Sequence, residues 1–545
     1  MTPISVPDLL PNFDPNPTKF TPTKPFTTPH HTSSVITSIK LCFLRILWIQ
    51  LMGLGEQEKE NNQPLLISAP YQEEQEEDLY NQQQESNTGN LIRRTWVESK
   101  KTWHIAGPSI FTRLAMFSLT VITQAFAGHL SDHDLAAISI VTTVIIGITF
   151  GFLLGMASAL ETLCGQAYGA KQYHRLGIYM QRSWVVLFLS SILLLPLFVF
   201  ATPILKLTGQ SAAVAELAGV VALWLIPMHL SFAFQFTLVR FLQCQLKTAV
   251  AAWVSGLALA LHVFVSWLFV YKLRVGIVGT AITLDFSWWV SVLGLFCYVG
   301  CGGCPQSWTG FSEQAFVGLW DFFKLSVASG VMLSLENFYY RVLIIISGNM
   351  NNAEVALDAL SICITIYAWE SMIPLGFFAA TGVRVANELG AGNAEGAKFA
   401  TIVSVFTSLV VGLFFWFLIV VFPDKLAMIF TSNTSVITMV NELALLLAFT
   451  VLFNCIQPVL SGVAVGSGWQ ALVAFINIGS YYIVGVPLGV ILGCLLDFGI
   501  KGIWAGMISG TVVQTLILAI ITVRCKWEKE VQIARIHMTS QAATE

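Results

Sequence analysis

Residues 400–422 read ATIVSVFTSLVVGLFFWFLIVVF, a run that contains no charged side chain. A helix rises about 1.5 Å per residue, so a run of this length crosses the roughly 30 Å hydrocarbon core of a bilayer. The stretch therefore predicts a membrane-spanning helix.

The composition of the whole chain supports the same class of protein. Of the 545 residues, 55% are apolar and 11% are charged, and the mean hydropathy is +0.72. Soluble domains carry about 25% charged residues, so most of this chain does not meet water. The net charge of -3, with 28 Lys and Arg, argues against a nucleic-acid partner, which would need a basic surface.

The ten cysteines form no recognisable framework. Most stand singly in apolar runs, where a thiol behaves as a small hydrophobic group. Cys301 and Cys304 make a lone Cys-Gly-Gly-Cys without a second pair or a nearby His. We therefore expect no disulfide framework, metal or cofactor.

Further apolar runs follow one another from Ile105 onward and predict an all-α polytopic protein with twelve transmembrane helices. Their approximate bounds are Ile105–Ala127, Leu135–Leu160, Gly177–Ile204, Val214–Val239, Thr248–Val270, Gly276–Val299, Leu325–Ile346, Val355–Ala379, Ala400–Phe422, Val436–Val459, Ala471–Leu495 and Gly502–Val523.

Residues 1–104 differ in composition from the rest of the chain. Prolines are frequent among Thr and Ser near the start, and a Gln/Glu-rich run follows from Gln72 to Glu85. Such a segment cannot bury enough apolar surface to fold, so we expect a disordered cytosolic tail. The other expected divisions are a six-helix lobe at 105–304, a cytosolic linker at 305–324, a second six-helix lobe at 325–523 and a cytosolic tail at 524–545.

The loop cations predict the orientation, because cytoplasmic loops retain Lys and Arg. Most of them fall on the side of the N-terminus, so both termini should be cytosolic. The opposite loops carry only Lys206, Lys272, Arg274, Lys425 and Lys501.

The two halves of the chain resemble each other. Gly-Gln-Ala-Tyr-Gly-Ala at 165–170 matches Ala-Asn-Glu-Leu-Gly-Ala at 386–391, and Gly-Ile-Val-Gly at 276–279 matches Gly-Ile-Lys-Gly at 499–502. Nearly equal offsets indicate a duplicated, pseudo-symmetric six-helix bundle. In transporters built this way, the substrate path lies between the two bundles near the midplane.

Signatures of soluble enzymes are missing. The chain has no Walker phosphate loop, dinucleotide-binding glycine fingerprint, His-Glu-x-x-His or Gly-x-Ser-x-Gly. We therefore expect no catalytic residues and no enzyme activity, and energy for uphill transport would come from an ion gradient or a partner.

Ionisable residues within the predicted spans indicate where ion coupling occurs, because each costs at least ~2.5–3.5 kcal/mol at the bilayer centre. They are Arg113, Asp285, Glu336, Arg341 and Glu370. Three carboxylates face two guanidiniums, so one carboxylate must bind a proton or a cation. Glu336 lies near the middle of its span and is our candidate, with Asp285 and Glu370 as further proton-coupling candidates; each could instead pair with a cation on another helix.

Aromatic residues near these acids are candidates for the substrate wall. Trp288, Tyr339, Tyr340 and Tyr367 could hold flat or cationic organic molecules by stacking and cation–π attraction. For any one of them, ordinary helix packing is the alternative.

Four motifs resemble those of the plant branch of the multidrug and toxic compound extrusion transporters. They are Leu-Glu-Thr-Leu-Cys-Gly-Gln-Ala-Tyr-Gly-Ala (160–170), Arg-Phe-Leu-Gln-Cys-Gln (240–245), Arg-Val-Ala-Asn-Glu-Leu-Gly-Ala-Gly-Asn (384–393) and Gly-Val-Ala-Val-Gly-Ser-Gly-Trp-Gln (462–470). The resemblance covers about residues 100 to 525. It implies two six-helix lobes, alternating access, and export of organic solutes in exchange for protons.

The resemblance also assigns roles to single residues. Glu336 falls on an acidic residue of the seventh helix that is implicated in proton coupling. Many relatives have an Asp in the tenth helix, three residues before a Gln; here the Gln is Gln457 and the matching residue is Asn454. Because an amide cannot titrate, either Glu336 acts alone in this lobe or Asp285 and Glu370 take part. Asn454 and Gln457 are among the residues expected to bind substrate.

The expected function is proton-coupled antiport of organic metabolites or xenobiotics, such as flavonoids, alkaloids or organic cations. A channel or uniporter for chloride or organic anions is the alternative, supported by Arg113 and Arg341. A membrane-embedded enzyme or a lipid flippase is a less well supported alternative. Expected partners are a small organic solute, protons and membrane lipid, with no obligatory protein partner. The vacuolar membrane is preferred over the plasma membrane.

Overall fold

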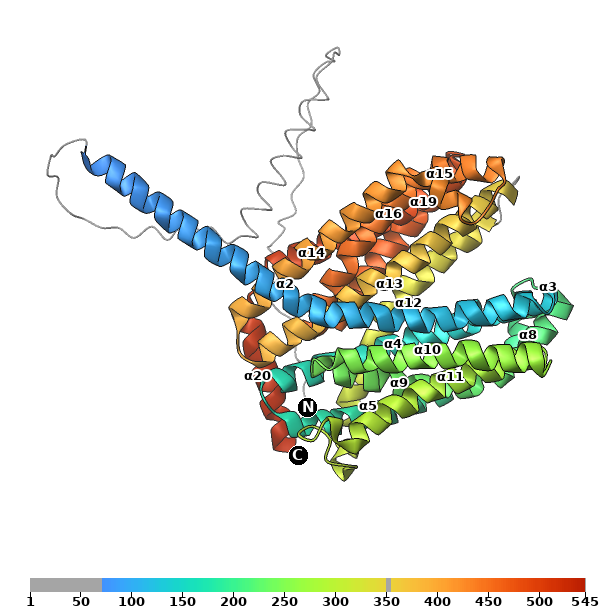
Figure 1. The fold of residues 1–545 in the computed structure, drawn as a ribbon, viewed down its shortest axis with the longest axis horizontal. Coiled ribbons are helices and arrows are strands. Elements are labelled where there is room, and N and C mark those ends of the chain that lie inside the picture. The colour runs from blue at the N-terminus through green and yellow to red at the C-terminus, as the bar shows by residue number, and fades with distance from the viewer. Residues whose placement is uncertain (1–70, 349–353, 545) are drawn as a thin grey trace, which may run out of the picture. The chain divides into compact units, whose positions relative to one another are not determined.

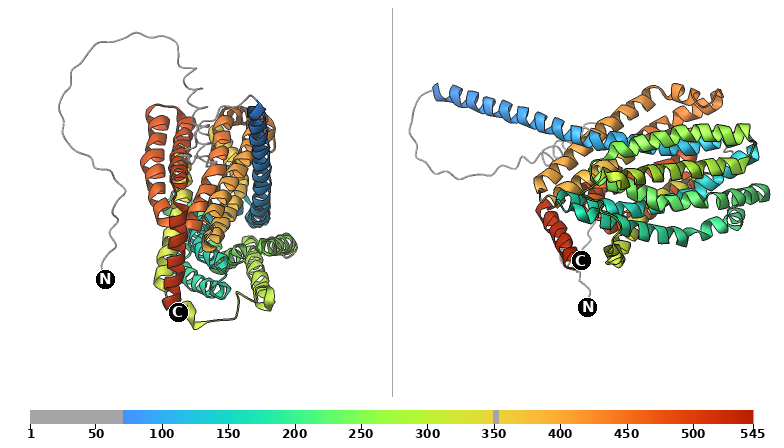
Figure 2. Two further views of the ribbon diagram at one scale, coloured as in Figure 1. Left: turned by 90° about the vertical axis from the view of Figure 1, so that its left-hand side faces the viewer. Right: turned by 60° about the horizontal axis from the view of Figure 1, so that its bottom comes forward.

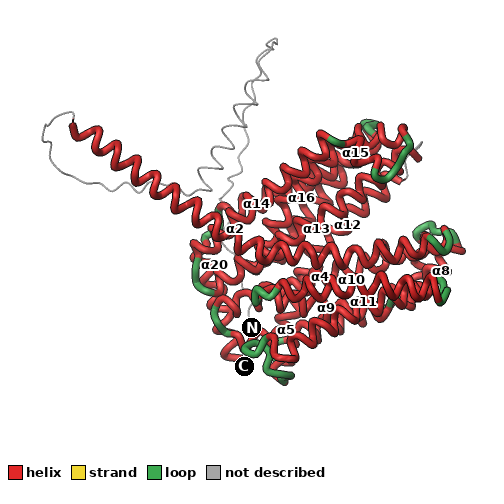
Figure 3. The backbone as a smooth tube through the Cα atoms, viewed as in Figure 1, coloured by secondary structure: helices red, strands yellow, loops and turns green. Residues whose placement is uncertain are grey.

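The computed structural model describes residues 71–348 and 354–544, so the predicted tail over residues 1–70 lies outside it. Every regular element in the described residues is a helix, and none is a strand (Figures 1 and 3). Leu66–Glu545 forms one compact unit. The long, almost continuously apolar runs account for this, since only a helix satisfies all backbone groups within one segment in lipid.

The N-terminal half of the bundle comprises the elements before the linker. Its helices are α2 (Tyr71–Gly128), α3 (Asp132–Ile140), η1 (Val141–Ile146), α4 (Gly147–Gly169), α5 (Tyr173–Leu194), α6 (Pro196–Val199), α7 (Ala201–Leu207), α8 (Ala212–Trp224), α9 (Ile226–Cys244), α10 (Thr248–Ser266), η2 (Trp267–Lys272), α11 (Ile277–Tyr298) and η3 (Val299–Gly303).

The C-terminal half follows a short helix η4 (Glu313–Phe316). Its helices are α12 (Leu319–Gly348), α13 (Glu354–Gly390), α14 (Ala394–Val421), α15 (Pro423–Met428), α16 (Thr434–Ser467), α17 (Gln470–Asn477), η5 (Ile478–Gly485), α18 (Val486–Val490), η6 (Ile491–Leu495) and α19 (Gly499–Val523), with α20 (Trp527–Thr544) after them.

The predicted class, an all-helical polytopic membrane protein, is confirmed. Within the described residues, ten helical stretches are long and apolar enough to cross a membrane, and the bent pair of α8 and α9 makes an eleventh. The 30-residue α12 stands where the seventh span was predicted and carries the polar Glu336 and Asn337. The series is consistent with twelve membrane helices.

The predicted N-terminal tail is too long. Residues 71–104 continue into the first span as one helix, and Glu98 is only 6% exposed. Arg384 of α13 pairs with Glu98 at 2.6 Å, and Thr102 donates to the Glu98 carbonyl at 3.1 Å. Composition alone cannot predict this order, because the partner cation lies almost 300 residues away in the sequence.

The predicted C-terminal tail is helical as well. Trp527, Val531 and Ala534 of α20 are buried in one cluster with apolar residues of α13 and α16. Their spacing of three and four residues places them on one face of the helix. The part of the linker from Leu319 onward already belongs to α12.

The two halves meet through helix α4 of the N-terminal half. Gly155 lies against the backbone of Gly330 in α12, and Gly165 lies against Ala386 in α13, so small residues allow the helices to approach closely. Figure 2 shows the two halves as two groups of helices. They meet toward the end that carries α20 and diverge toward α8 and α15 (Figure 1).

Candidate functional site

One turn of α16 brings the predicted polar residues of the C-terminal half together. Asn454 and Gln457 are one helical turn apart, and Pro458 follows them. A proline has no N–H group, so the carbonyl of Asn454 lacks its usual helical donor. We call Asn454–Ser461 the α16 turn. It is polar on one face, although the helix around it is buried and apolar.

Glu336 reaches the α16 turn from α12. The Nε2 atom of Gln457 donates to Glu336 Oε2 at 3.3 Å and also to Ser461 Oγ at 3.0 Å. Among the ion pairs of the described residues, none includes this carboxylate. Its described polar partner is therefore a neutral amide.

Glu370 reaches the same turn from α13. Asn454 Nδ2 donates to Glu370 Oε2 at 3.3 Å, and Cys455 Sγ donates to the other oxygen at 3.2 Å. The hydroxyl of Tyr367 donates to Asn454 Oδ1 at 3.2 Å. Pro374 also leaves the Glu370 carbonyl without its helical donor. Five predicted site residues, Glu336, Tyr367, Glu370, Asn454 and Gln457, thus share one region.

This arrangement suits proton exchange. Neither carboxylate has a cation among its described polar contacts, so each can take up a proton without breaking an ion pair. Ionised carboxylates are costly within a membrane unless water or a cation reaches them. The balance between the neutral and charged forms therefore depends on whether the site is open to water.

Asp285 lies elsewhere, at the break between α8 and α9. These two helices meet at an angle of 48°, and Asp285 Oδ1 accepts the Met228 N–H at 3.0 Å. Trp289 Nε1 donates to the Pro227 carbonyl at 3.0 Å. The carboxylate thus caps the start of α9, where free N–H groups favour an anion.

Of the predicted aromatic residues, Tyr367 lies at the α16 turn, whereas Trp288 and Tyr339 pack elsewhere. Trp288 is 2% exposed and packs among Phe150, Phe232 and Phe236 in the N-terminal half. Tyr339 is fully buried, stacks on Tyr481 at 4.4 Å and donates to the Met507 carbonyl at 3.0 Å. Both side chains, Trp288 and Tyr339, pack against other residues of the protein.

The side chains of Tyr340 and Arg341 lie outside the described residues. Arg113, the other predicted intramembrane cation, interacts electrostatically with Glu161 and Arg240.

Glu161 and Arg240 form an ion pair that the sequence interpretation missed. Arg240 Nη1 lies 2.7 Å from Glu161 Oε2, and both side chains are almost fully buried. The signal was present, because Glu161 is the second residue of the motif at 160–170 and directly follows the predicted span that ends at Leu160. Arg240 was assigned to a loop from its place at the end of a predicted span.

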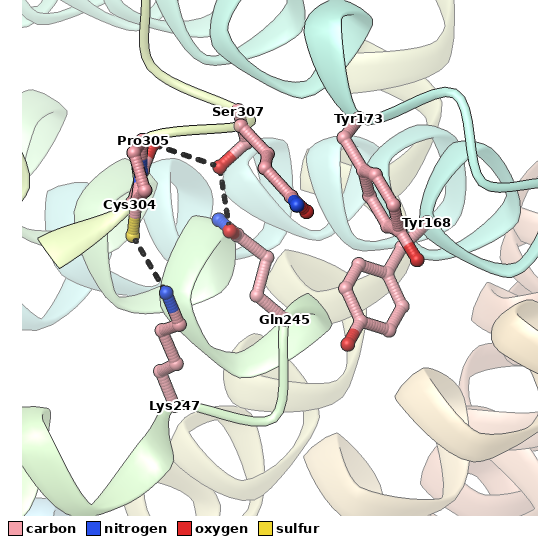
Figure 4. Close-up of a pocket in the computed structure, with 8 residues that line it drawn as sticks. Tyr168, Tyr173, Gln245, Lys247, Cys304, Pro305 and Ser307 are labelled. Carbon is pink, nitrogen blue, oxygen red and sulfur yellow. Dashed lines mark hydrogen bonds between the residues drawn. The ribbon is translucent and has the colours of Figure 1, made fainter.

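The described residues also contain a cavity of about 260 Å³ at the turns between α4 and α5 and between α9 and α10 (Figure 4). Ser307 Oγ donates to Gln245 Oε1 at 2.6 Å, and Lys247 Nζ lies 3.6 Å from Cys304 Sγ. Burial raises the pKa of the Cys304 thiol. Cys301 is exposed, so the two thiols of the Cys-Gly-Gly-Cys lie in different environments.

Comparison with known proteins gives consistent matches. The MatE family model matches residues 108–268 and 328–491, one stretch in each half. Protein DETOXIFICATION 27 of Arabidopsis thaliana is 58% identical over 493 residues, covering 90% of this chain and 99% of the relative. Protein DETOXIFICATION 20 of the same plant is 49% identical over 448 residues, covering 82% and 91%.

A solved structure is similar along most of its length. The crystal structure of the eukaryotic MATE transporter AtDTX14 superposes with a TM-score of 0.76 at 35% identity, covering 81% of this chain and 99% of that chain. An outward-facing multidrug resistance MATE family transporter shares the fold, with a TM-score of 0.68 at 16% identity and coverages of 82% and 96%.

Proposed function

Because the chain belongs to the MatE family of multidrug and toxic compound extrusion transporters, we propose that it exports organic solutes by alternating access in exchange for protons. Its relatives are secondary transporters rather than enzymes. The proposed coupling to protons rests on the residues at the α16 turn.

The observation that carries the proposal is the neutral environment of Glu336. Gln457 is its described hydrogen-bond partner, at 3.3 Å, and no cation is among its described polar contacts. A carboxylate in this position is neutralised by a proton when hydrocarbon and protein surround it. When its side of the protein opens to neutral water, it loses the proton and regains its charge.

The antiport cycle follows from these two forms of Glu336. A proton enters from the acidic compartment and is released on the cytosolic side, where a cationic or polar substrate can take its place. One pH unit across the membrane supplies ~1.4 kcal/mol per proton, enough for about tenfold accumulation. Glu370 contacts the same turn through Asn454 and is a second candidate site for a proton.

The orientation belongs to the same proposal. Most loop cations lie on the side of the N-terminus, so both termini face the cytosol and solute moves away from it. We propose that the protein is located in the vacuolar membrane, and the plasma membrane is the alternative location.

A specific observation supports the second candidate, an anion channel or uniporter. Arg113, Arg240 and Glu161 interact in the N-terminal half and carry one more positive than negative charge. The tenth-helix position holds the neutral Asn454 rather than an acid. An anion could therefore meet a net positive path.

Uptake into sealed vesicles with an imposed pH gradient distinguishes the two candidates. Flavonoids, alkaloids, organic acids and chloride would be offered to the full-length protein and to Glu336→Gln. We expect gradient-driven uptake of an organic solute, lost in Glu336→Gln and retained in Glu442→Gln. The control is matched because Glu442 is 48% exposed and pairs with Lys501. Large unitary chloride currents that persist in Glu336→Gln would instead establish the channel.

A further inference from the structure

A buried ion pair in the N-terminal half is closed over by the C-terminal half. Glu161 of α4 and Arg240 of α9 lie 2.7 Å apart, with 0% and 2% of their side chains exposed. The Glu161 carboxylate contacts Gly382 of α13 so closely that a Cβ atom there would lie 2.2 Å from Oε1. Arg240 lies over the ring of Phe378, 5.7 Å from its centre. Both halves therefore contribute to its burial.

Hydrogen bonds between the halves surround this pair. The hydroxyl of Thr162, next to Glu161, donates to the Val465 carbonyl at 2.5 Å. Gln166 Nε2 donates to the Gly466 carbonyl at 3.2 Å, and Gln470 Nε2 donates to Thr162 Oγ1 at 2.7 Å. The two halves cannot separate at this end without breaking these contacts.

The charges of the cluster oppose its burial. Arg113 adds a second positive charge that interacts electrostatically with both members of the pair, whereas the ion pair described for the carboxylate is the one with Arg240. Arg113 Nε, Arg240 Nη2 and Glu161 Oε1 are buried without a hydrogen-bond partner among the described residues. A buried, uncompensated positive charge is stabilised when water reaches it. The charges of the cluster thus favour separation of the two halves, and the hydrogen bonds around it favour their closure.

We propose that Glu161 is a positioning residue for transport, which with Arg240 forms a latch between the two halves at the α20 end. While Gly382 covers the Glu161 carboxylate, the path between the two halves is closed at the α20 end. When Gly382 moves away from the carboxylate, water reaches the pair of Glu161 and Arg240, and the path opens at that end. The inference rests on the proposed alternating access, but it does not depend on which solute or ion is carried.

Native cysteines report on the latch. Cys244 follows Arg240 by one helical turn, is 0% exposed, and its Sγ lies 3.5 Å from the Glu161 carbonyl. N-ethylmaleimide can reach it only when the halves separate. Labelling of the full-length protein in liposomes would be read for each cysteine by mass spectrometry, with the exposed Cys297 as the internal reference.

Two variants test the latch in different ways. Gly382→Ala places a methyl group against the carboxylate, and Glu161→Gln removes the charge while keeping the shape. We expect each to label Cys244 at least tenfold faster than the parent. Gly107→Ala is the matched control, because a Cβ there meets nothing within 4 Å, and it should label like the parent. Thermal melting identifies a variant that has simply unfolded.

Transport measurements distinguish a positioning role of Glu161 from a role in proton coupling. Glu161→Gln should lower the maximal transport rate and leave solute exchange sensitive to the pH gradient, and Glu161→Asp should restore part of the rate. Parental labelling of Cys244 in both Gly382→Ala and Glu161→Gln would overturn the latch. Proton-driven accumulation retained in Glu336→Gln, together with faster Cys244 labelling in Gly382→Ala and Glu161→Gln, would overturn the proposed coupling and leave the latch intact, so the two proposals fail separately.

Discussion

At the scale of single residues, the structure groups carboxylates with amides. Glu336 and Glu370 both contact the α16 turn, and their partners are Gln457, Asn454 and a thiol. The sequence indicated an acid without a cation, because intramembrane acids outnumbered the cations it could find. It could not indicate which amide faces which acid, since that depends on how α12, α13 and α16 pack.

The charge count in the sequence was also incomplete. Glu161 was read as part of a motif and Arg240 as a loop residue, although the two form a buried pair. Helix ends are the least certain feature of a sequence-based prediction. A shift of a few residues moved Arg240 from water into the protein interior.

Replacing Asn454 by Asp should make stability depend on pH. The new carboxylate would lie where the amide donates to Glu370 at 3.3 Å, and two acids at that distance repel unless they share a proton. We expect Asn454→Asp to lose about 1–3 kcal/mol of unfolding free energy at pH 8 and less at pH 5. Thermal melting of the purified variant at both pH values measures this, and an equal loss at both would contradict it.

At the scale of elements, the apolar pattern predicts where helices span, but not where they break. The fourth predicted span is a bent pair, α8 and α9, whose break precedes Pro227. Asp285 caps the break from another helix. The terminal segments show the same limit, because Glu98 and α20 are ordered by partners that are distant in the sequence.

The capping role of Asp285 predicts different effects for two substitutions. Asp285→Asn keeps an oxygen that can accept the Met228 N–H, so it should stay near parental stability and keep proton-driven transport. Asp285→Ala removes the acceptor and should cost about 1–2 kcal/mol, as for other lost helix caps. Thermal melting and vesicle uptake check both, and loss of proton coupling in Asp285→Asn would instead support a coupling role.

The docking of α20 is testable through the thiol that precedes it. Burial raises the pKa of Cys525 to about 12, with Glu530 and Glu528 adding to the effect. The thiol is therefore protonated at pH 8 and reacts slowly, because the thiolate is the nucleophile.

Trp527→Ala removes the buried anchor of α20 next to this thiol. We expect Cys525 to react with N-ethylmaleimide about tenfold faster at pH 8, as its pKa returns toward the ordinary value. The exposed Cys297 serves as the control and should not change. An unchanged rate at Cys525 would mean that α20 does not bury it.

At the scale of the whole molecule, two halves of similar sequence close on each other through glycines and alanines. The repeated motifs predicted the duplication but not this contact, in which Gly165 of one copy lies against Ala386 of the other. The cluster of two guanidiniums and one carboxylate in the N-terminal half was not predictable, because it depends on how α2, α4 and α9 pack. Among the described residues, Glu336 and Glu370 of the C-terminal half and Asp285 of the N-terminal half form no ion pair.

The central claim is that the charge on Glu336 couples the halves to a proton gradient. The most direct test compares solute exchange without a pH gradient with uptake driven by one, in vesicles that contain the parent or Glu336→Gln. We predict that Glu336→Gln still exchanges solute at a rate near the parent, because binding and movement remain, but no longer accumulates it. Parental accumulation by Glu336→Gln would contradict the account.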